Sequence, residues 1–148
     1  MPVMVNHKEI TDEAIYQEMQ YHPAGSADLA MEEAARALVI RELLLQKAEY
    51  LNIQCEETTD QPKEEALMDA LIATVIQLPE PDAEVIDRFY QNNGHRFPKV
   101  DGQTPPLKDV QEAISDYLVE TSWTNALRDF IRSLVQEATL SGVEFVLQ

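Results

Sequence analysis

The stretch that decides the fold is Ala34-Ala35-Arg36-Ala37-Leu38-Val39-Ile40-Arg41-Glu42-Leu43-Leu44-Leu45-Gln46. Its apolar residues recur at helical spacing, and the same pattern extends both ways to predict a long helix over about residues 28–51. Leu38 and Leu45 widen the apolar stripe of this helix. A stripe of this width favours packing against more than one neighbouring element.

Further helices flank this one on both sides, so the pattern predicts about five helices. The first begins at Thr11, whose side chain is expected to cap the helix. Others are predicted over residues 63–78, over 82–92 with Asp82 as the cap, and over 107–141. One face of the last helix is expected to be buried: Val110, Ile114, Tyr117, Thr121, Leu127, Ile131, Leu134 and Ala138.

Short apolar segments near the two ends of the chain predict strands. Val3–Val5 and residues 143–147 are the candidates, and their pairing would tie the termini together. We therefore expect an all-α fold of about five helices, with a long C-terminal helix and a small two-stranded pairing of the termini. The length of 148 residues suits a single domain over 1–148.

The chain is strongly acidic. It has 11 Lys and Arg against 27 Asp and Glu, a formal net charge of −16. Such a charge argues against nucleic-acid binding through a basic face and against an anionic membrane surface, because both partners would be repelled. Residues 56–87 hold ten acids and one base. This segment is typical of a solvated face, with attraction of a basic partner or mimicry of nucleic acid as alternatives.

The residues that could carry catalysis do not form a recognisable constellation. His7, His22 and His95 fall in predicted loops or at helix ends. Glu18 and His22 could share a helix face, but two ligands alone do not make a metal site. Cys55, which precedes two acidic residues, has neighbours that disfavour a thiolate, and a lone cysteine forms no internal disulfide. We expect no catalytic residue, no metal and no cofactor.

Several segments nevertheless resemble a known family. Val5-Asn6-His7-Lys8-Glu9-Ile10-Thr11 is similar to the start of SurA-type chaperone domains, with His7 where that family usually has glycine. A sequence pattern of bacterial parvulin-type (PpiC-like) peptidyl-prolyl isomerases, including the nitrogenase-maturation branch, is similar to residues 18–24 followed by residues 34–46. Residues 79–97 and the segment from Pro105 to Glu144 are similar to what precedes and follows the isomerase module in that family.

The resemblance also implies an absence. In such relatives the parvulin module lies between the Arg-Phe pair that matches residues 96–97 and the last helix. Here only Pro98-Lys99-Val100-Asp101-Gly102-Gln103-Thr104 fills that gap, and seven residues cannot form an isomerase domain. The resemblance therefore implies an N-terminal part over 1–97, a linker over 98–106 in place of the module, and a C-terminal helix and strand over 107–148. We expect no enzyme activity.

The main functional hypothesis is a noncatalytic, chaperone-like domain that binds unfolded or nascent polypeptide. Its groove is expected between the long C-terminal helix and the second and third helices. The candidate client-binding residues are Met19, Tyr21, Leu45, Met68, Phe89 and Trp123. The alternative is a helical interaction module that forms a homodimer by exchange of the C-terminal helix. A third alternative is a prolyl isomerase by family name only, or an acidic mimic of nucleic acid.

The first residues carry neither the basic nor the apolar region of a signal peptide, and no apolar run approaches the ~20 residues that span a bilayer. We expect a cytoplasmic protein without membrane insertion, or a periplasmic one if a leader has been removed.

Overall fold

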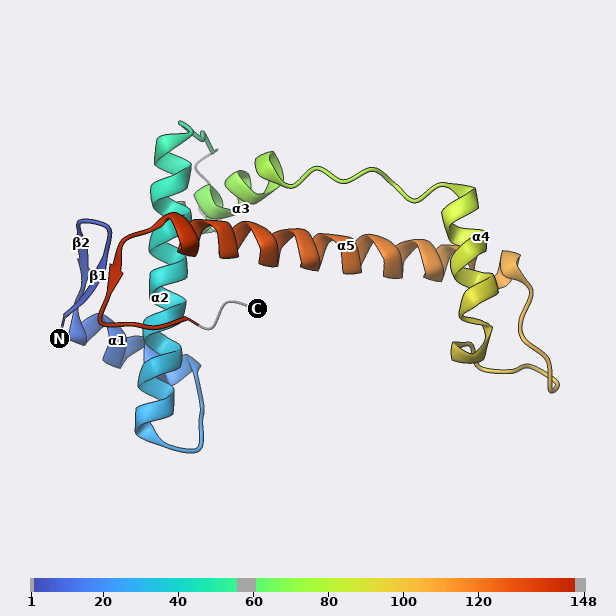
Figure 1. Cartoon of the computed structure of the whole chain (residues 1–148), viewed down its shortest axis with the longest axis horizontal. Helices are drawn as coiled ribbons and strands as arrows, with labels where there is room; N and C mark the ends of the chain where they lie inside the picture. The colour runs from blue at the N-terminus through green and yellow to red at the C-terminus, as the bar shows by residue number, and fades with distance from the viewer. Residues whose placement is uncertain (1, 56–60, 146–148) are drawn as a thin grey trace. The chain divides into compact units, whose positions relative to one another are not determined.

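The computed structural model describes residues 2–55 and 61–145. Within these residues the chain is mostly helical and carries a small three-stranded antiparallel sheet. The helices are α1 (Asp12–Glu18), α2 (Ala27–Tyr50), α3 (Lys63–Val75), α4 (Ala83–Asn92) and α5 (Leu107–Glu137) (Figure 1). Two 3-10 turns, η1 (Met19–Tyr21) and η2 (Gly94–Arg96), follow α1 and α4.

Side-chain caps define where three of these helices begin. The Thr11 hydroxyl accepts a hydrogen bond from the Ala14 amide at 3.1 Å, and Asp82 accepts one from the Val85 amide at 2.9 Å, so both predicted caps are confirmed. Ser26 caps α2 in the same way, through the Leu29 amide. The caps satisfy backbone amides that the first helical turn leaves unpaired.

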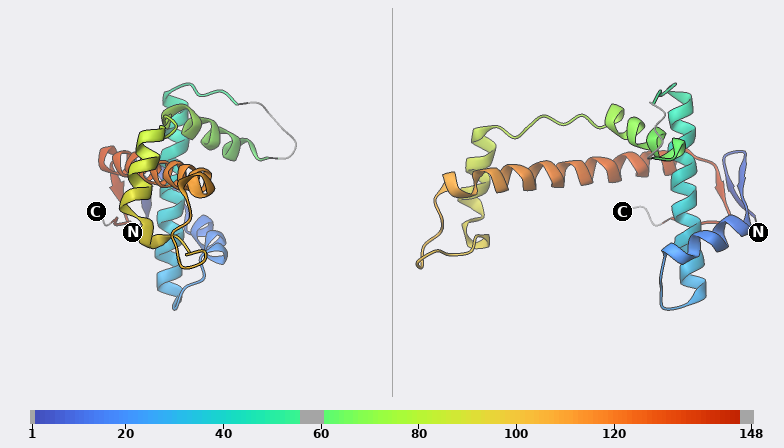
Figure 2. Two further views of the ribbon diagram at one scale, coloured as in Figure 1. Left: turned by 90° about the vertical axis from the view of Figure 1, so that its right-hand side faces the viewer. Right: turned by 180° about the vertical axis from the view of Figure 1, so that it is seen from behind.

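The sheet differs from the expected two-stranded pairing. A hairpin of β1 (Val3–Val5) and β2 (Lys8–Ile10) is joined on the other edge of β1 by β3 (Leu140–Ser141), which gives the order β2-β1-β3. The strand predicted over 143–147 is wrong in position: residues 143–145 are not strand, and 146–147 lie outside the described residues. Figure 2 shows β3 beside this hairpin.

A tight turn explains where β3 falls. Asn6, at φ 57°, donates its backbone amide to the Thr139 carbonyl at 2.8 Å, and its side-chain oxygen accepts from the Thr139 amide at 2.9 Å. This pair of hydrogen bonds fixes the register, so that Val5 faces Leu140. Because the strand begins at Leu140, α5 ends at Glu137 and not at the predicted residue 141.

The chain divides into two compact units. Unit 1 comprises residues 1–75 and 128–148, and unit 2 comprises residues 76–127. The core of unit 1 combines the hairpin, α1, α2, α3 and the end of α5: Val3, Val5, Ile10, Ile15, Ala34, Ala35, Val39, Leu43, Leu44, Ala48, Leu71, Leu134 and Val135. Six of these thirteen residues lie on α2: Ala34, Ala35, Val39, Leu43, Leu44 and Ala48. Leu38 and Leu45, which were expected to widen the apolar stripe of this helix, are only partly buried.

Unit 2 has a smaller interior. Ile86 of α4 and Ile114 of α5 are its buried apolar side chains among the described residues. Phe89 packs against Tyr117 with ring centroids 5.5 Å apart. The expected burial of Tyr117 and Thr121 is wrong: both are exposed, because within unit 2 nothing covers that part of the α5 surface fully.

The segment between residues 98 and 106 forms a tight turn in unit 2. Val100 and Gln103 exchange backbone hydrogen bonds of 2.9 and 3.1 Å. Between them, Asp101 and Gly102 both adopt positive φ, at 53° and 78°. Two consecutive positive φ values are the backbone of a two-residue hairpin turn, for which Asp-Gly is a preferred pair.

Candidate functional site

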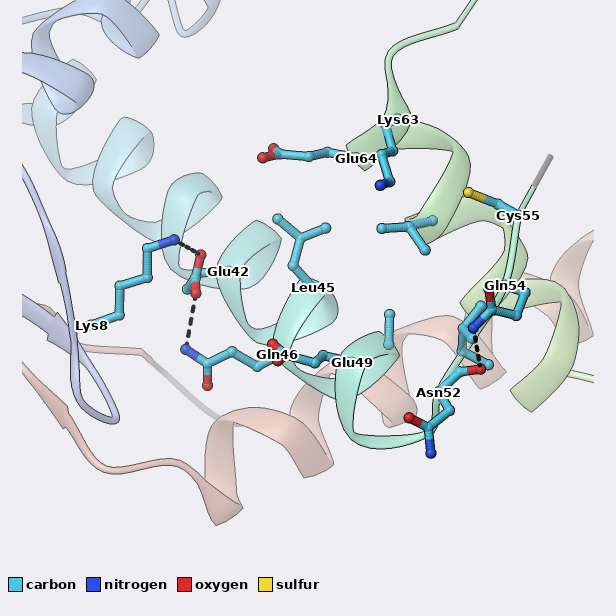
Figure 3. A pocket seen from close by; sticks show the side chains of 13 residues that line it. Lys8, Glu42, Leu45, Gln46, Glu49, Asn52, Gln54, Cys55, Lys63 and Glu64 are labelled. Atoms are coloured by element: carbon cyan, nitrogen blue, oxygen red, sulfur yellow. Dashed lines mark hydrogen bonds and ion pairs between the residues drawn. The ribbon is translucent and has the colours of Figure 1, made fainter. Parts of the chain in front are cut away.

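A cleft of about 570 Å³ opens in unit 1 between α2, α3 and the loop that follows α2. Its apolar floor comes from both helices and from that loop: Leu45, Ala48, Ile53 and Leu67. Figure 3 shows Leu45 directed from α2 toward the start of α3, where Lys63 and Glu64 lie. We call this site the α2–α3 cleft.

The end of α2 builds one wall of the cleft. Asn52 adopts φ 55°, which turns the chain back, and the Ile53 amide then donates to the Ala48 carbonyl at 2.9 Å. This arrangement is a common way for a helix to end, with asparagine tolerated at the left-handed position. It places Ile53 against the helix and carries the carboxamides of Asn52 and Gln54 to the rim (Figure 3).

A polar network supports the opposite side of the cleft. Among the described residues Glu42 is the one charged residue that is buried. Its carboxylate forms an ion pair with Lys8 Nζ at 3.3 Å and accepts a hydrogen bond from Gln46 Nε2 at 3.0 Å (Figure 3). Gln46 Oε1 accepts in turn from Asn6 Nδ2 at 2.7 Å. The network therefore connects the hairpin turn to α2, and a buried carboxylate with two donors avoids the cost of an unpaired charge.

The first four residues proposed for client binding lie in unit 1. Leu45 lines the α2–α3 cleft, half-buried. Met19 and Met68 are partly buried and pack against the core. Tyr21 closes η1 with 69% of its surface exposed. The four residues therefore lie in different environments, and Leu45 is the one among them that lines the α2–α3 cleft.

The remaining two lie in unit 2. Phe89, on α4, is partly buried against Tyr117. Trp123, on α5, is 42% exposed and lines a shallow groove of about 440 Å³ with Val119.

A second cleft of unit 1, of about 650 Å³, lies where α1, α2 and the segment after β3 meet. Ile15, Met31 and Val143 give it apolar walls, and Arg36 donates from Nε to the Glu144 carbonyl at 2.9 Å across it. None of these residues was among the six client-binding candidates chosen from the sequence. Met31 continues the α2 periodicity, but the pattern did not indicate that it would remain exposed at a cleft.

The sequence analysis also did not predict the polar residues at the rim of the α2–α3 cleft. Asn52 and Gln54 stand in a polar loop, and a carboxamide in a loop gives no signal of facing a cleft. The acidic segment expected over 56–87 falls partly outside the described residues, at 56–60.

The structure describes one pair of titratable side chains that was singled out from the sequence. His22 Nε2 lies 3.1 Å from Glu18 Oε1, so the expected proximity of this pair is confirmed. Within residues 2–55 and 61–145, no group of three or more His, Cys, Asp or Glu side chains is placed to hold a metal ion. What the α2–α3 cleft offers is an apolar floor with amide and charged groups around it.

No protein-family model, curated protein or solved structure matches the chain. The class that the fold defines is accordingly a mostly helical protein with a small antiparallel sheet. None of the described helices combines the length and the apolar character needed to cross a membrane.

Proposed function

We propose that this protein is a noncatalytic, chaperone-like domain that binds extended apolar segments of unfolded or nascent polypeptide in the α2–α3 cleft. The observation that carries the proposal is a cleft in which an apolar floor is surrounded by carboxamides and charged side chains. Leu45, selected from the sequence as a client-binding residue, lines that floor.

An extended polypeptide has two needs that this cleft meets. Its apolar side chains gain free energy when they leave water, and the floor around Leu45 and Leu67 receives them. Its backbone amides and carbonyls lose water at the same time and need partners. Asn52 supplies both a donor and an acceptor, because its carboxamide makes no hydrogen bond within the described residues.

The proposal includes the absence of isomerase chemistry. This part of the proposal is supported by the short segment over 98–104, which holds one tight turn at the place where the isomerases that the sequence resembles carry their catalytic module. The net charge of −16 further favours clients with basic residues beside their apolar ones.

The single cysteine makes the cleft directly testable, because Cys55 lines it and is partly exposed. The rate of Cys55 alkylation by a maleimide is to be measured with and without a 15-residue peptide of alternating leucine, serine and lysine. We expect the peptide to slow alkylation in a saturable way. In parallel, an equimolar amount of the protein should suppress the aggregation of insulin reduced at 25 °C.

Two substitutions on the same helix provide a matched comparison. Leu45→Gln removes apolar floor and should weaken peptide protection of Cys55 about tenfold, the equivalent of losing one buried apolar side chain. Leu29→Gln changes an exposed leucine outside the cleft and should leave protection unchanged. Circular dichroism confirms that both variants are folded. Unprotected Cys55 together with unsuppressed aggregation would contradict the proposal, as would equal effects of the two substitutions.

A further inference from the structure

A separate groove on α5 lies wholly within unit 2. Ser115, Val119 and Trp123 are spaced by four residues and so form one row along the helix, with Asp116 and Glu120 in the neighbouring row. Glu80, from the segment before α4, completes the lining. We call this site the Trp123 groove.

The groove is lined by two large apolar side chains and by three carboxylates. Trp123 is 42% exposed and Val119 is 40% exposed, and the two lie next to each other in one row of α5 and line the same groove. The carboxylates of Glu80, Asp116 and Glu120 form no ion pair within the described residues. A partly exposed indole side chain therefore lines the same groove as three carboxylates that have no ion-pair partner among the described residues.

None of the basic residues of unit 2 lines the Trp123 groove, so they do not neutralise its three carboxylates there. The unit has nine acidic and four basic residues. Arg88 pairs with Glu84 at 3.3 Å, and the Arg96 guanidinium lies 5.7 Å from the centre of the Tyr117 ring. Neither arginine lines the Trp123 groove.

We infer that the Trp123 groove binds an arginine or lysine side chain of a polypeptide partner, together with an adjacent apolar residue. A guanidinium or ammonium group is attracted to the face of an indole ring, and neighbouring carboxylates strengthen the attraction and give it direction. Val119 then receives the apolar neighbour. The inference deepens the proposed function and rests on it, since it names a chemical preference of the polypeptide that the protein binds.

Charge complementarity also selects among possible occupants. A second copy of this chain would bring another strongly acidic surface to the groove, and like charges placed opposite each other oppose association. An anionic ligand is disfavoured for the same reason. A basic polypeptide segment is the occupant that both the indole and the carboxylates favour.

Because Trp123 is the only tryptophan of the chain, its fluorescence reports on this groove alone. The probe is a 12-residue peptide of repeated arginine, serine and leucine, and the control peptide replaces each arginine with glutamate. We expect a saturable change in emission with the arginine peptide and none with the glutamate peptide. Raising NaCl from 50 to 500 mM should raise the Kd several-fold, because screening weakens the attraction between exposed charges.

Two charge reversals in unit 2 separate the groove from the general acidity of the chain. Glu120→Lys should weaken binding of the arginine peptide about tenfold, because it places a like charge beside Trp123. Asp87→Lys makes the same change in net charge on exposed α4, outside the groove lining, and should change Kd less than twofold. Equal weakening by both variants would overturn the inference, as would an equal response to the two peptides.

The two reporters keep this inference distinct from the proposed function. Protection of Cys55 with no response of Trp123 would leave the cleft proposal standing and refute the groove. Loss of both responses would refute both. A change in Trp123 emission that follows protein concentration without any peptide, with a dimeric mass by light scattering, would assign the groove to a second copy and also overturn the inference.

Discussion

In unit 1 the core draws on segments from both ends of the chain, whereas unit 2 is built from one continuous stretch. Val5 in β1 and Leu134 in α5 belong to the same buried cluster of unit 1, although they are far apart in sequence. Unit 2 buries Ile86 and Ile114 and relies otherwise on partly exposed aromatic contacts. The difference in buried apolar surface implies that unit 1 is the more stable of the two.

The difference in core size between the two units also applies to the supports of their candidate binding sites. The α2–α3 cleft rests on a packed core and a buried polar network, so its geometry is largely preformed. The Trp123 groove lies along an exposed face of one helix, supported by fewer buried residues. Preformed sites lose less conformational entropy on binding, and we therefore expect the α2–α3 cleft to contribute more of the affinity for apolar segments.

The largest expected effect comes from removing a core side chain in each unit. Leu71, in unit 1, is fully buried and Ile114, in unit 2, is 1% exposed. Leu71→Ala should cost about 3 kcal/mol of unfolding free energy, and Ile114→Ala about 2 kcal/mol, because the smaller interior of unit 2 can relax around the cavity. Urea denaturation followed by circular dichroism measures both losses.

Trp123 fluorescence assigns each loss to a unit, because the tryptophan lies in unit 2. Ile114→Ala should shift the fluorescence transition to lower urea, whereas Leu71→Ala should shift chiefly the transition seen by circular dichroism. Identical shifts of both signals in both variants would show that the two units unfold as one, which would contradict the proposed difference in stability.

The next comparison uses two glycines with nearly the same backbone. Gly142 in unit 1 has φ 77° and Gly102 in unit 2 has φ 78°, so alanine is strained at both. A Cβ atom at Gly142 would stand 2.5 Å from the Pro2 carbonyl oxygen, whereas nothing lies within 4 Å at Gly102. Gly102→Ala should therefore cost about 1 kcal/mol, and Gly142→Ala about 2 kcal/mol or more.

The two melting temperatures test this, since about 1 kcal/mol corresponds to a shift of a few degrees in a chain of this size. Hydrogen exchange adds a local readout: Gly142→Ala should speed exchange in β1 and β3. Equal destabilisation by the two variants would mean that the close approach to Pro2 is relieved without cost.

How far the sequence predicts this fold depends on how local the cause is. The caps at Thr11 and Asp82 were predictable, because a side chain three residues from its amide partner decides them. The position of β3 was not, because it is set by the contact of Asn6 with Thr139, 133 residues away in sequence. Residues 143–147 have the stronger strand pattern, yet the chain pairs at Leu140–Ser141.

The candidate site shows the same division. Periodicity placed Leu45 on the stripe of α2, and that residue does line a cleft. Periodicity cannot tell a covered position from an uncovered one, and so Tyr117 was expected to be buried although it is 44% exposed. The carboxamides of Asn52 and Gln54 depend on how the chain turns after α2, which rests on one left-handed residue.

The smallest expected effect concerns a single hydrogen bond of unit 2. The Tyr90 hydroxyl donates to the Pro105 carbonyl at 2.6 Å and connects α4 to the end of the 98–106 segment. Tyr90→Phe keeps the ring, which packs 5.8 Å from Phe97 between centroids, and removes only the hydroxyl. The loss should be about 1 kcal/mol, the usual net value of one hydrogen bond.

Tyr16→Phe is the control, since the Tyr16 hydroxyl makes no hydrogen bond within the described residues and its side chain is 60% exposed in unit 1. It should leave stability unchanged. Faster hydrogen exchange at residues 98–106 in Tyr90→Phe alone would show that this bond holds the turn against α4. If exchange in that segment is the same in both variants, the turn is stabilised by the Asp101-Gly102 backbone and not by Tyr90. The structure of unit 2 would then depend mainly on contacts that are local in sequence.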